Sequence, residues 1–263
     1  MLKKLLKYDL TSIFKFLIIF YSLAIFFALS ARFFLSFENS LAMEIIGQIF
    51  SGAAISMMFS IMINNLMRLW VRFKNNFYND ESYLTHTLPI DRRTQYMSKF
   101  FSAVITMLVS VFVIALTLFI AYYSKDNMTF VKSILFPVAD SINISAGVLI
   151  SALIILIFLE FLNILQCGFT GIILGHRMLS GKIGLSVVFG FVTSGVTQFI
   201  LLVVLLIMGL FNDSLMNMFI TNSPVDFGTF KLVAVVSILV YVILVSAVCV
   251  TNVKLLRRGV NVE

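Results

Sequence analysis

Long apolar runs, each about as long as a membrane is thick, constrain this chain more than any other feature. The stretch from Ala152 to Leu159 is apolar at every position, so a helix built from it presents hydrocarbon on all sides. About 20 helical residues cross a hydrocarbon core of about 30 Å. We therefore expect six spans, at Phe16 to Leu35, Ile45 to Leu69, Phe100 to Tyr122, Ile144 to Leu174, Leu185 to Phe211 and Leu232 to Val253.

These runs predict an all-α, polytopic membrane protein whose 263 residues form a single transmembrane domain, residues 1–263. Hydrophobic residues make up 60% of the chain and charged residues 12%, whereas soluble domains carry about 25% charged residues. A β-barrel would instead show short segments that alternate between apolar and polar residues. The six spans leave too few residues for a separate soluble domain.

The basic residues predict the orientation of the spans, because lysine and arginine are retained on the cytoplasmic side. Of the 19 lysines and arginines, all except Arg32, Lys125, Lys132 and Lys231 fall on the side of the two termini and of the loops after the second and fourth spans. We therefore expect a multi-pass protein with both termini in the cytoplasm.

The residues before the first span predict an amphipathic surface helix. One face carries Lys3, Lys4, Lys7 and Thr11, and the opposite face is apolar, with Leu2, Leu5, Leu6, Leu10 and Ile13. Such a helix suits the inner membrane surface, where it contacts membrane lipid. Its role stays open between a lysine-rich anchor that sets topology and a helix that also contacts a partner protein.

The loop between the second and third spans, Val71 to Ser98, has the highest density of charge in the chain. Asn79 or Asp80 can cap a short helix, and Pro89 disfavours helical geometry at the residue before it. The sequence thus predicts two turns of helix over Asp80, Glu81, Ser82, Tyr83, Leu84, Thr85, His86 and Thr87. Its amphipathic and aromatic side chains suit docking into a groove of another protein, while a plain solvated loop is the alternative.

At this loop the chain resembles a known family. Tyr78-Asn-Asp-Glu-Ser-Tyr-Leu-Thr-His-Thr-Leu-Pro-Ile90 is similar to the loop of type-2 ATP-binding-cassette (ABC) exporter permeases from Firmicutes, related to lantibiotic-immunity and drug exporters. Ser82 stands where the family often has glycine. A second, weaker similarity is Gln166-Cys-Gly-Phe-Thr-Gly-Ile-Ile-Leu-Gly-His176, at the end of the fourth span.

The resemblance implies a permease subunit without catalysis of its own that exports an amphipathic substrate such as an antimicrobial peptide, a drug or a lipid. Asp80 to Thr87 would be the coupling helix that contacts a separate ATPase subunit, which would bind ATP and magnesium. A second permease half, identical or paralogous, would complete the pathway. Consistent with this, the stretch closest to a phosphate-binding loop, Gly175 to Ile183, has the wrong spacing and no hydroxyl after Lys182.

The fourth span carries a strip of polar residues on one helix face: Glu160, Asn163, Gln166 and Thr170. Intramembrane acids are costly and mark functional sites or interhelical networks. The strip is therefore open to two interpretations, a substrate path or a set of satisfied helix contacts. It also supports an alternative function, an ion- or proton-coupled secondary transporter or channel that uses Glu160.

Other classes of function fit the sequence poorly. The two histidines, His86 and His176, lack neighbouring ligands at metal-binding spacing, so we expect no metal site. The same scarcity of bases argues against an intramembrane enzyme. A nucleic-acid partner would require a basic soluble face, which the spans leave no room for.

Overall fold

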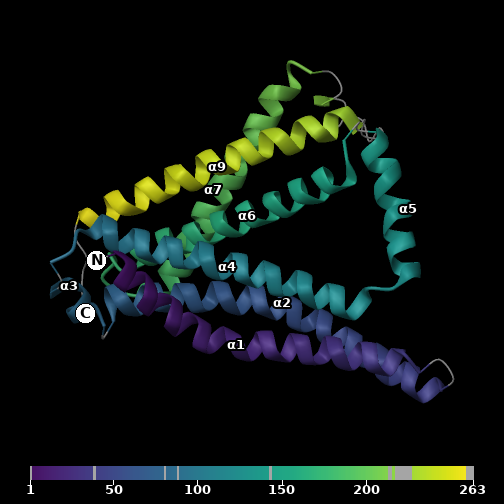
Figure 1. Cartoon of the computed structure of the whole chain (residues 1–263). Helices are drawn as coiled ribbons and strands as arrows, with labels where there is room; N and C mark the ends of the chain where they lie inside the picture. The colour runs from purple at the N-terminus through teal and green to yellow at the C-terminus, as the bar shows by residue number, and fades with distance from the viewer. Residues whose placement is uncertain are drawn as a thin grey trace. The chain divides into compact units, whose positions relative to one another are not determined.

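A computed structural model of the chain describes residues 2–37, 40–79, 81–87, 89–141, 144–212, 215–216 and 227–258. Among these residues, six helices are long and apolar enough to cross a membrane, as predicted: α1 (Leu2–Leu35), α2 (Leu41–Tyr78), α4 (Arg92–Tyr122), α6 (Ala146–Gly175), α7 (Lys182–Gly209) and α9 (Phe227–Arg257). The protein is thus an all-helical, multi-pass membrane protein (Figure 1). It comprises two compact units, Met1–Thr129 and Phe130–Glu263.

The helices are longer than the apolar runs that predicted them. Helix α2 continues past the predicted end at Leu69 to Tyr78, because the intervening residues include no glycine or proline to end it. Helix α1 likewise includes both the amphipathic segment and the first predicted span in one uninterrupted helix of 34 residues. At 1.5 Å per residue it is about 51 Å long.

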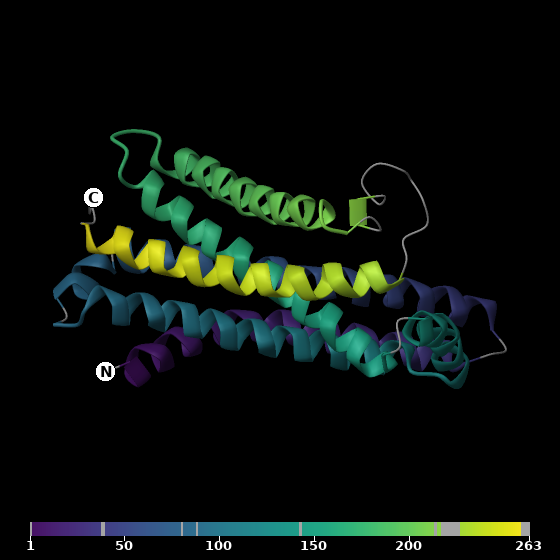
Figure 2. The same ribbon diagram turned by 90° about the horizontal axis from the view of Figure 1, so that it is seen from above.

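In the first unit, α1, α2 and α4 lie side by side in both ribbon views (Figures 1 and 2). The buried positions of α1 follow a spacing of four and three residues, which keeps one stripe against its neighbours. Ala24, Ala28 and Ala31 in this stripe are fully buried, and their small side chains let the helices approach closely.

A polar contact in the apolar interior ties these three helices together. The Tyr21 hydroxyl lies 2.8 Å from the Ser110 hydroxyl, and the Asn65 amide donates to the same Ser110 oxygen at 2.9 Å. Each residue comes from a different helix, α1, α4 and α2, and all three are buried. Because hydrocarbon offers no alternative partner, such bonds favour one helix register.

The loops after α4 and α7 differ in how much of them the structure describes. Residues Lys125–Ser141 form α5, a helix of 17 residues that includes Pro137. Most of the stretch between α7 and α9 lies outside the described residues.

In the second unit, α6 packs against α7 and α9 (Figure 2). The contact with α7 is so close that glycine is required at two positions. A Cβ atom on Gly171 would lie 2.6 Å from the Gly190 nitrogen, and one on Gly175 would lie 2.5 Å from the Ser186 nitrogen. These small residues therefore set the α6–α7 crossing.

Candidate functional site

The short helix α3 (Ser82–Thr87) lies between the end of α2 and the start of α4, where the sequence predicts a coupling helix. Its first backbone amide, on Ser82, donates to the Asn79 carbonyl at 2.7 Å. The side chain of Ser82 is fully buried, whereas Tyr83 is 67% exposed. The helix therefore has one side against the protein and an aromatic side chain turned to its surroundings.

Two side chains from the long helices hold α3 in place. Asn76 of α2 donates through Nδ2 to Glu81 Oε2 at 2.6 Å, just before α3. Gln95 of α4 donates through Nε2 to the Thr85 carbonyl at 2.9 Å. Helix α3 is thus bonded to both helices that flank its loop.

Beneath α3, a buried carboxylate joins the three long helices of the first unit. Asp9 of α1 accepts from Arg72 Nε of α2 at 3.0 Å and from Lys99 Nζ of α4 at 2.5 Å. The Ser98 hydroxyl also donates to it at 3.2 Å. The Asp9 side chain is only 4% exposed, so these partners replace the water it has lost.

The two cations have further partners, because one carboxylate does not satisfy both. Arg72 Nη1 donates to the Ser12 hydroxyl at 2.9 Å, and Lys99 Nζ donates to Asn76 Oδ1 at 2.8 Å. Removing one member of a buried ion pair leaves an uncompensated charge, which costs about 3–5 kcal/mol. We call Asp9, Arg72, Asn76 and Lys99 the charge cluster.

The charge cluster is continuous with α3. The Asn76 amide accepts from Lys99 through its oxygen and donates to Glu81 through its nitrogen. A chain of hydrogen bonds therefore runs from Glu81 through Asn76 and Lys99 to Asp9. This chain includes residues of α1, α2 and α4, so it joins the residue just before α3 to all three helices.

The predicted coupling residues have different positions in the structure. Glu81 and Thr85 make the contacts with α2 and α4, and Tyr83 and Thr87 are exposed. Asp80 lies outside the described residues, as do the side chains of Leu84 and His86.

The sequence patterns did not indicate the charge cluster or the role of Gln95. Asp9 was the available signal, since it is the only acid in a segment that also holds Lys3, Lys4, Lys7 and Lys15. A lone acid inside an amphipathic helix is a candidate for an ion pair with another element. The sequence does not indicate which of the many cations would pair with it.

In the second unit, three residues of the polar strip form contacts between helices. Asn163 Nδ2 donates to the Thr197 hydroxyl of α7 at 2.9 Å. The Thr170 hydroxyl donates to Asn252 Oδ1 of α9 at 2.8 Å, and Asn252 Nδ2 donates to Gln166 Oε1 at 3.2 Å. Asn163, Gln166 and Thr170 therefore each take part in a hydrogen bond to a neighbouring helix.

Glu160 differs from the rest of the strip. It is half-buried, and within the described part of the chain no hydrogen bond or ion pair to it is seen. The structure thus separates it from the network of Asn163, Gln166 and Thr170. Among the residues described, no three His, Cys, Asp or Glu side chains gather closely enough to hold a metal ion.

No family model, no curated protein and no solved structure matches this chain.

Proposed function

We propose that this chain is the membrane-spanning permease subunit of an ATP-driven ABC exporter. It would sit in the bacterial cytoplasmic membrane with both termini inside, next to a second permease half. A separate ATPase subunit would bind ATP and magnesium. The exported substrate would be amphipathic, such as an antimicrobial peptide, a drug or a lipid.

The observation that carries the proposal is the hydrogen-bonded connection between α3 and the charge cluster. A coupling element must present a surface to its partner and transmit force to the spans. Exposed Tyr83 supplies such a surface, and the contacts of Glu81 and Thr85 supply the attachment. Aromatic side chains such as Tyr83 are enriched where proteins dock. Movement of the ATPase subunits would thus act through α3 on α1, α2 and α4.

The proposal is tested by photo-crosslinking from α3 in native membranes. A photoreactive phenylalanine analogue at Tyr83 is expected to capture a chain of nucleotide-binding type, identified by mass spectrometry. Tyr123 is a matched control, since it is also an exposed tyrosine but follows α4 at the opposite end of that helix. The analogue at Tyr123 is expected to capture no such chain.

A functional measurement on the purified complex complements the crosslink. Tyr83→Asp is expected to reduce the stimulation of ATP hydrolysis by the permease, whereas Tyr123→Asp leaves it unchanged. The proposal is wrong if the crosslinker at Tyr83 reacts, as shown by its mass, yet captures no nucleotide-binding chain. If the permease with Tyr83→Asp still stimulates ATP hydrolysis fully, α3 has no coupling role.

A further inference from the structure

Helix α7 has one side against α6 in the second unit and leaves the rest of its surface open. Only 6% of the residues in its most apolar stretch are buried, whereas the other five spans bury 22–33%. Thr197 marks the side that contacts α6. On another side, residues recur at intervals of three and four, and we call them the α7 stripe: Val187, Phe191, Ser194, Gln198 and Leu202. Ser194 is half-buried, and the other four are exposed.

The α7 stripe carries an amide near the middle of the span. Gln198 lies about 24 Å from the start of α7 at Lys182 and about 17 Å from its end at Gly209. Its side chain is exposed, and within the described part of the chain no hydrogen bond to it is seen. A carboxamide has two N–H donors and an acceptor oxygen. Hydrocarbon satisfies none of them, so a partner for Gln198 must come from another protein segment.

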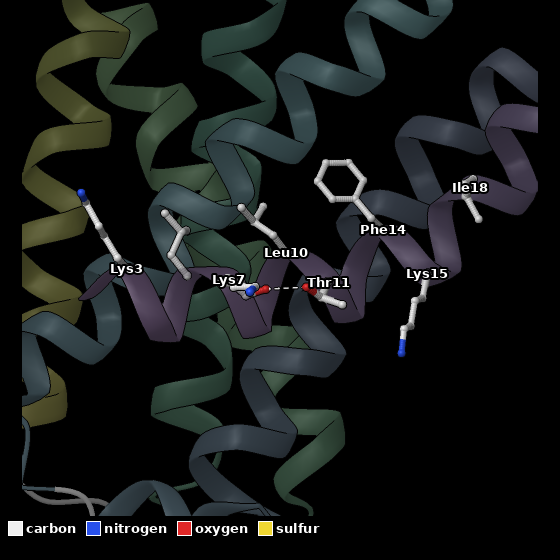
Figure 3. A pocket seen from close by; sticks show the side chains of 8 residues that line it. Lys3, Lys7, Leu10, Thr11, Phe14, Lys15 and Ile18 are labelled. Carbon is white, nitrogen blue, oxygen red and sulfur yellow. Dashed lines mark hydrogen bonds between the residues drawn. The ribbon is translucent and has the colours of Figure 1, made fainter. Parts of the chain in front are cut away.

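Other polar side chains on the long helices bond within their own helix. Thr11 donates to the Lys7 carbonyl at 2.8 Å, as Figure 3 shows. Ser22 likewise donates to the carbonyl four residues before it at 2.7 Å. The amide of Asn64 on α2 does the same at 2.9 Å. Gln198 lacks such a bond among the described residues, which distinguishes it from these side chains.

We propose that two copies of this chain associate along the α7 stripe and that their Gln198 side chains pair with each other. Two copies inserted in the same direction are related by a twofold axis along the membrane normal, so a residue beside the axis meets its own counterpart. A carboxamide is self-complementary, because each amide can donate an N–H group to the oxygen of the other. The inference rests on the proposed function in one respect: it makes the second permease half identical to the first.

The other residues of the α7 stripe fit a copy of the same stripe. Val187, Phe191 and Leu202 supply apolar contact on either side of the amide along the helix. Ser194 lies one turn from Gln198, and its small side chain lets two helices approach closely. The stripe has no charged residue, so it offers nothing to neutralise a charged partner helix in the membrane. An uncharged helix with an amide at the same depth is the partner that satisfies it.

Disulfide crosslinking of the chain in its native membrane tests the interface. Cys167→Ala and Cys249→Ala first remove the two native thiols. Ser194→Cys or Leu202→Cys then places one thiol about a helical turn before or after Gln198. Two such thiols beside a twofold axis form a disulfide if their Cα atoms lie about 4.4–6.8 Å apart. Two separate variants keep the test valid if one of them does not fold.

Mild oxidation is expected to join chains that carry Ser194→Cys or Leu202→Cys into a species of twice the 29.6 kDa mass of the chain. Mass spectrometry of this species should find this chain alone. Val196→Cys is the matched control, because Val196 is exposed on the same helix at nearly the same depth. It lies about 160° around the helix axis from Gln198. The chain with Val196→Cys should therefore remain a single chain.

A second measurement tests the amide itself. Förster transfer between donor-labelled and acceptor-labelled copies in phosphatidylcholine vesicles reports association as the chain is diluted with lipid. Gln198→Leu keeps an apolar side chain of similar size but removes the amide. It is expected to weaken association by about five- to thirtyfold, the effect of losing an intramembrane hydrogen bond. Val196→Leu, on the other side of the helix, should leave association unchanged.

Three outcomes would overturn the proposal. If Ser194→Cys and Leu202→Cys give no dimer of this chain, the stripe is open to lipid or covered by another segment or another protein. Equal crosslinking at Val196→Cys would indicate random collision of chains. Equal association of the Gln198→Leu variant and the unmodified chain would show that the amides do not pair. All three leave the crosslink from Tyr83 to a nucleotide-binding chain untouched, so they are distinct from a failure of the proposed function.

Discussion

Lys99 of α4 donates to the carboxylate of Asp9 of α1 across 2.5 Å, although 90 positions separate them in the chain. The contact joins α1 to α4 at the end of the first unit that holds α3. It also links the first turns of α1 to the loop that holds α3, because Lys99 donates to Asn76 and Asn76 donates to Glu81. The N-terminal segment is therefore bonded to α2 and α4.

Replacing Asp9 with asparagine is expected to destabilise the first unit by about 3–5 kcal/mol, because Arg72 and Lys99 would remain buried without a counter-charge. Unfolding in mild detergent can be followed by the fluorescence of Trp70, which lies in α2 of this unit. Asp140→Asn is the matched control, since Asp140 is exposed, and should change stability by less than about 0.5 kcal/mol.

A double variant tests whether the lost stability arises from the unpaired charge of Lys99. Asp9→Asn combined with Lys99→Met removes one of the two unpaired cations and should recover part of the lost stability. If Asp9→Asn proves as stable as the unmodified chain, the charge cluster does not hold these helices together.

Gly171→Ala is expected to destabilise the second unit by about 1–3 kcal/mol or more, because the added methyl group meets the backbone of α7. Gly195→Ala, on α7 with no atom within 4 Å of the added group, should instead stabilise its helix by up to about 1 kcal/mol. Buried Cys167 can report unfolding through its reaction with a thiol dye, after Cys249→Ser removes the other cysteine. Equal stability of the two alanine variants would contradict the close α6–α7 crossing.

Asn252→Leu is expected to destabilise the second unit by about 1–2 kcal/mol, because Thr170 and Gln166 lose their partner on α9. The same thiol assay measures the effect. Thr251→Val serves as the control, since Thr251 is exposed and its hydroxyl donates to the Ala247 carbonyl of its own helix. Glu160→Gln should leave stability nearly unchanged, and a loss as large as that of Asn252→Leu would place Glu160 in the network.

The spans were predictable from the sequence because a bilayer imposes a minimum length on every apolar run. Helix α3 was also predictable, since Pro89 disfavours helical geometry at the residue before it and so marks where the helix ends. The predicted start at Asp80 lies outside the described residues, and the helix is described from Ser82. The placement of Gly171 at a helix contact follows similarly from the small side chains around it.

The contacts between distant residues could not be read from the sequence. The chain offers many hydroxyls and amides as partners for Tyr21, and only the helix register selects Ser110 and Asn65. The same holds for Asp9, because the sequence contains many lysines and arginines with which it could pair. Periodicity identifies the buried face of a helix, but the rotation and the axial position of the neighbouring helices decide which residues meet there.

Helix α1 is continuous, so its apolar span and the first turns that carry Lys3 and Lys7 move as one rigid helix. Its 34 residues include no proline or glycine, the usual sites of a sharp kink. A rotation of the span about its own axis must therefore carry Lys3 and Lys7 around with it. Because Asp9 on the same helix pairs with Arg72 and Lys99, such a rotation requires these ion pairs to break or to move with the helix.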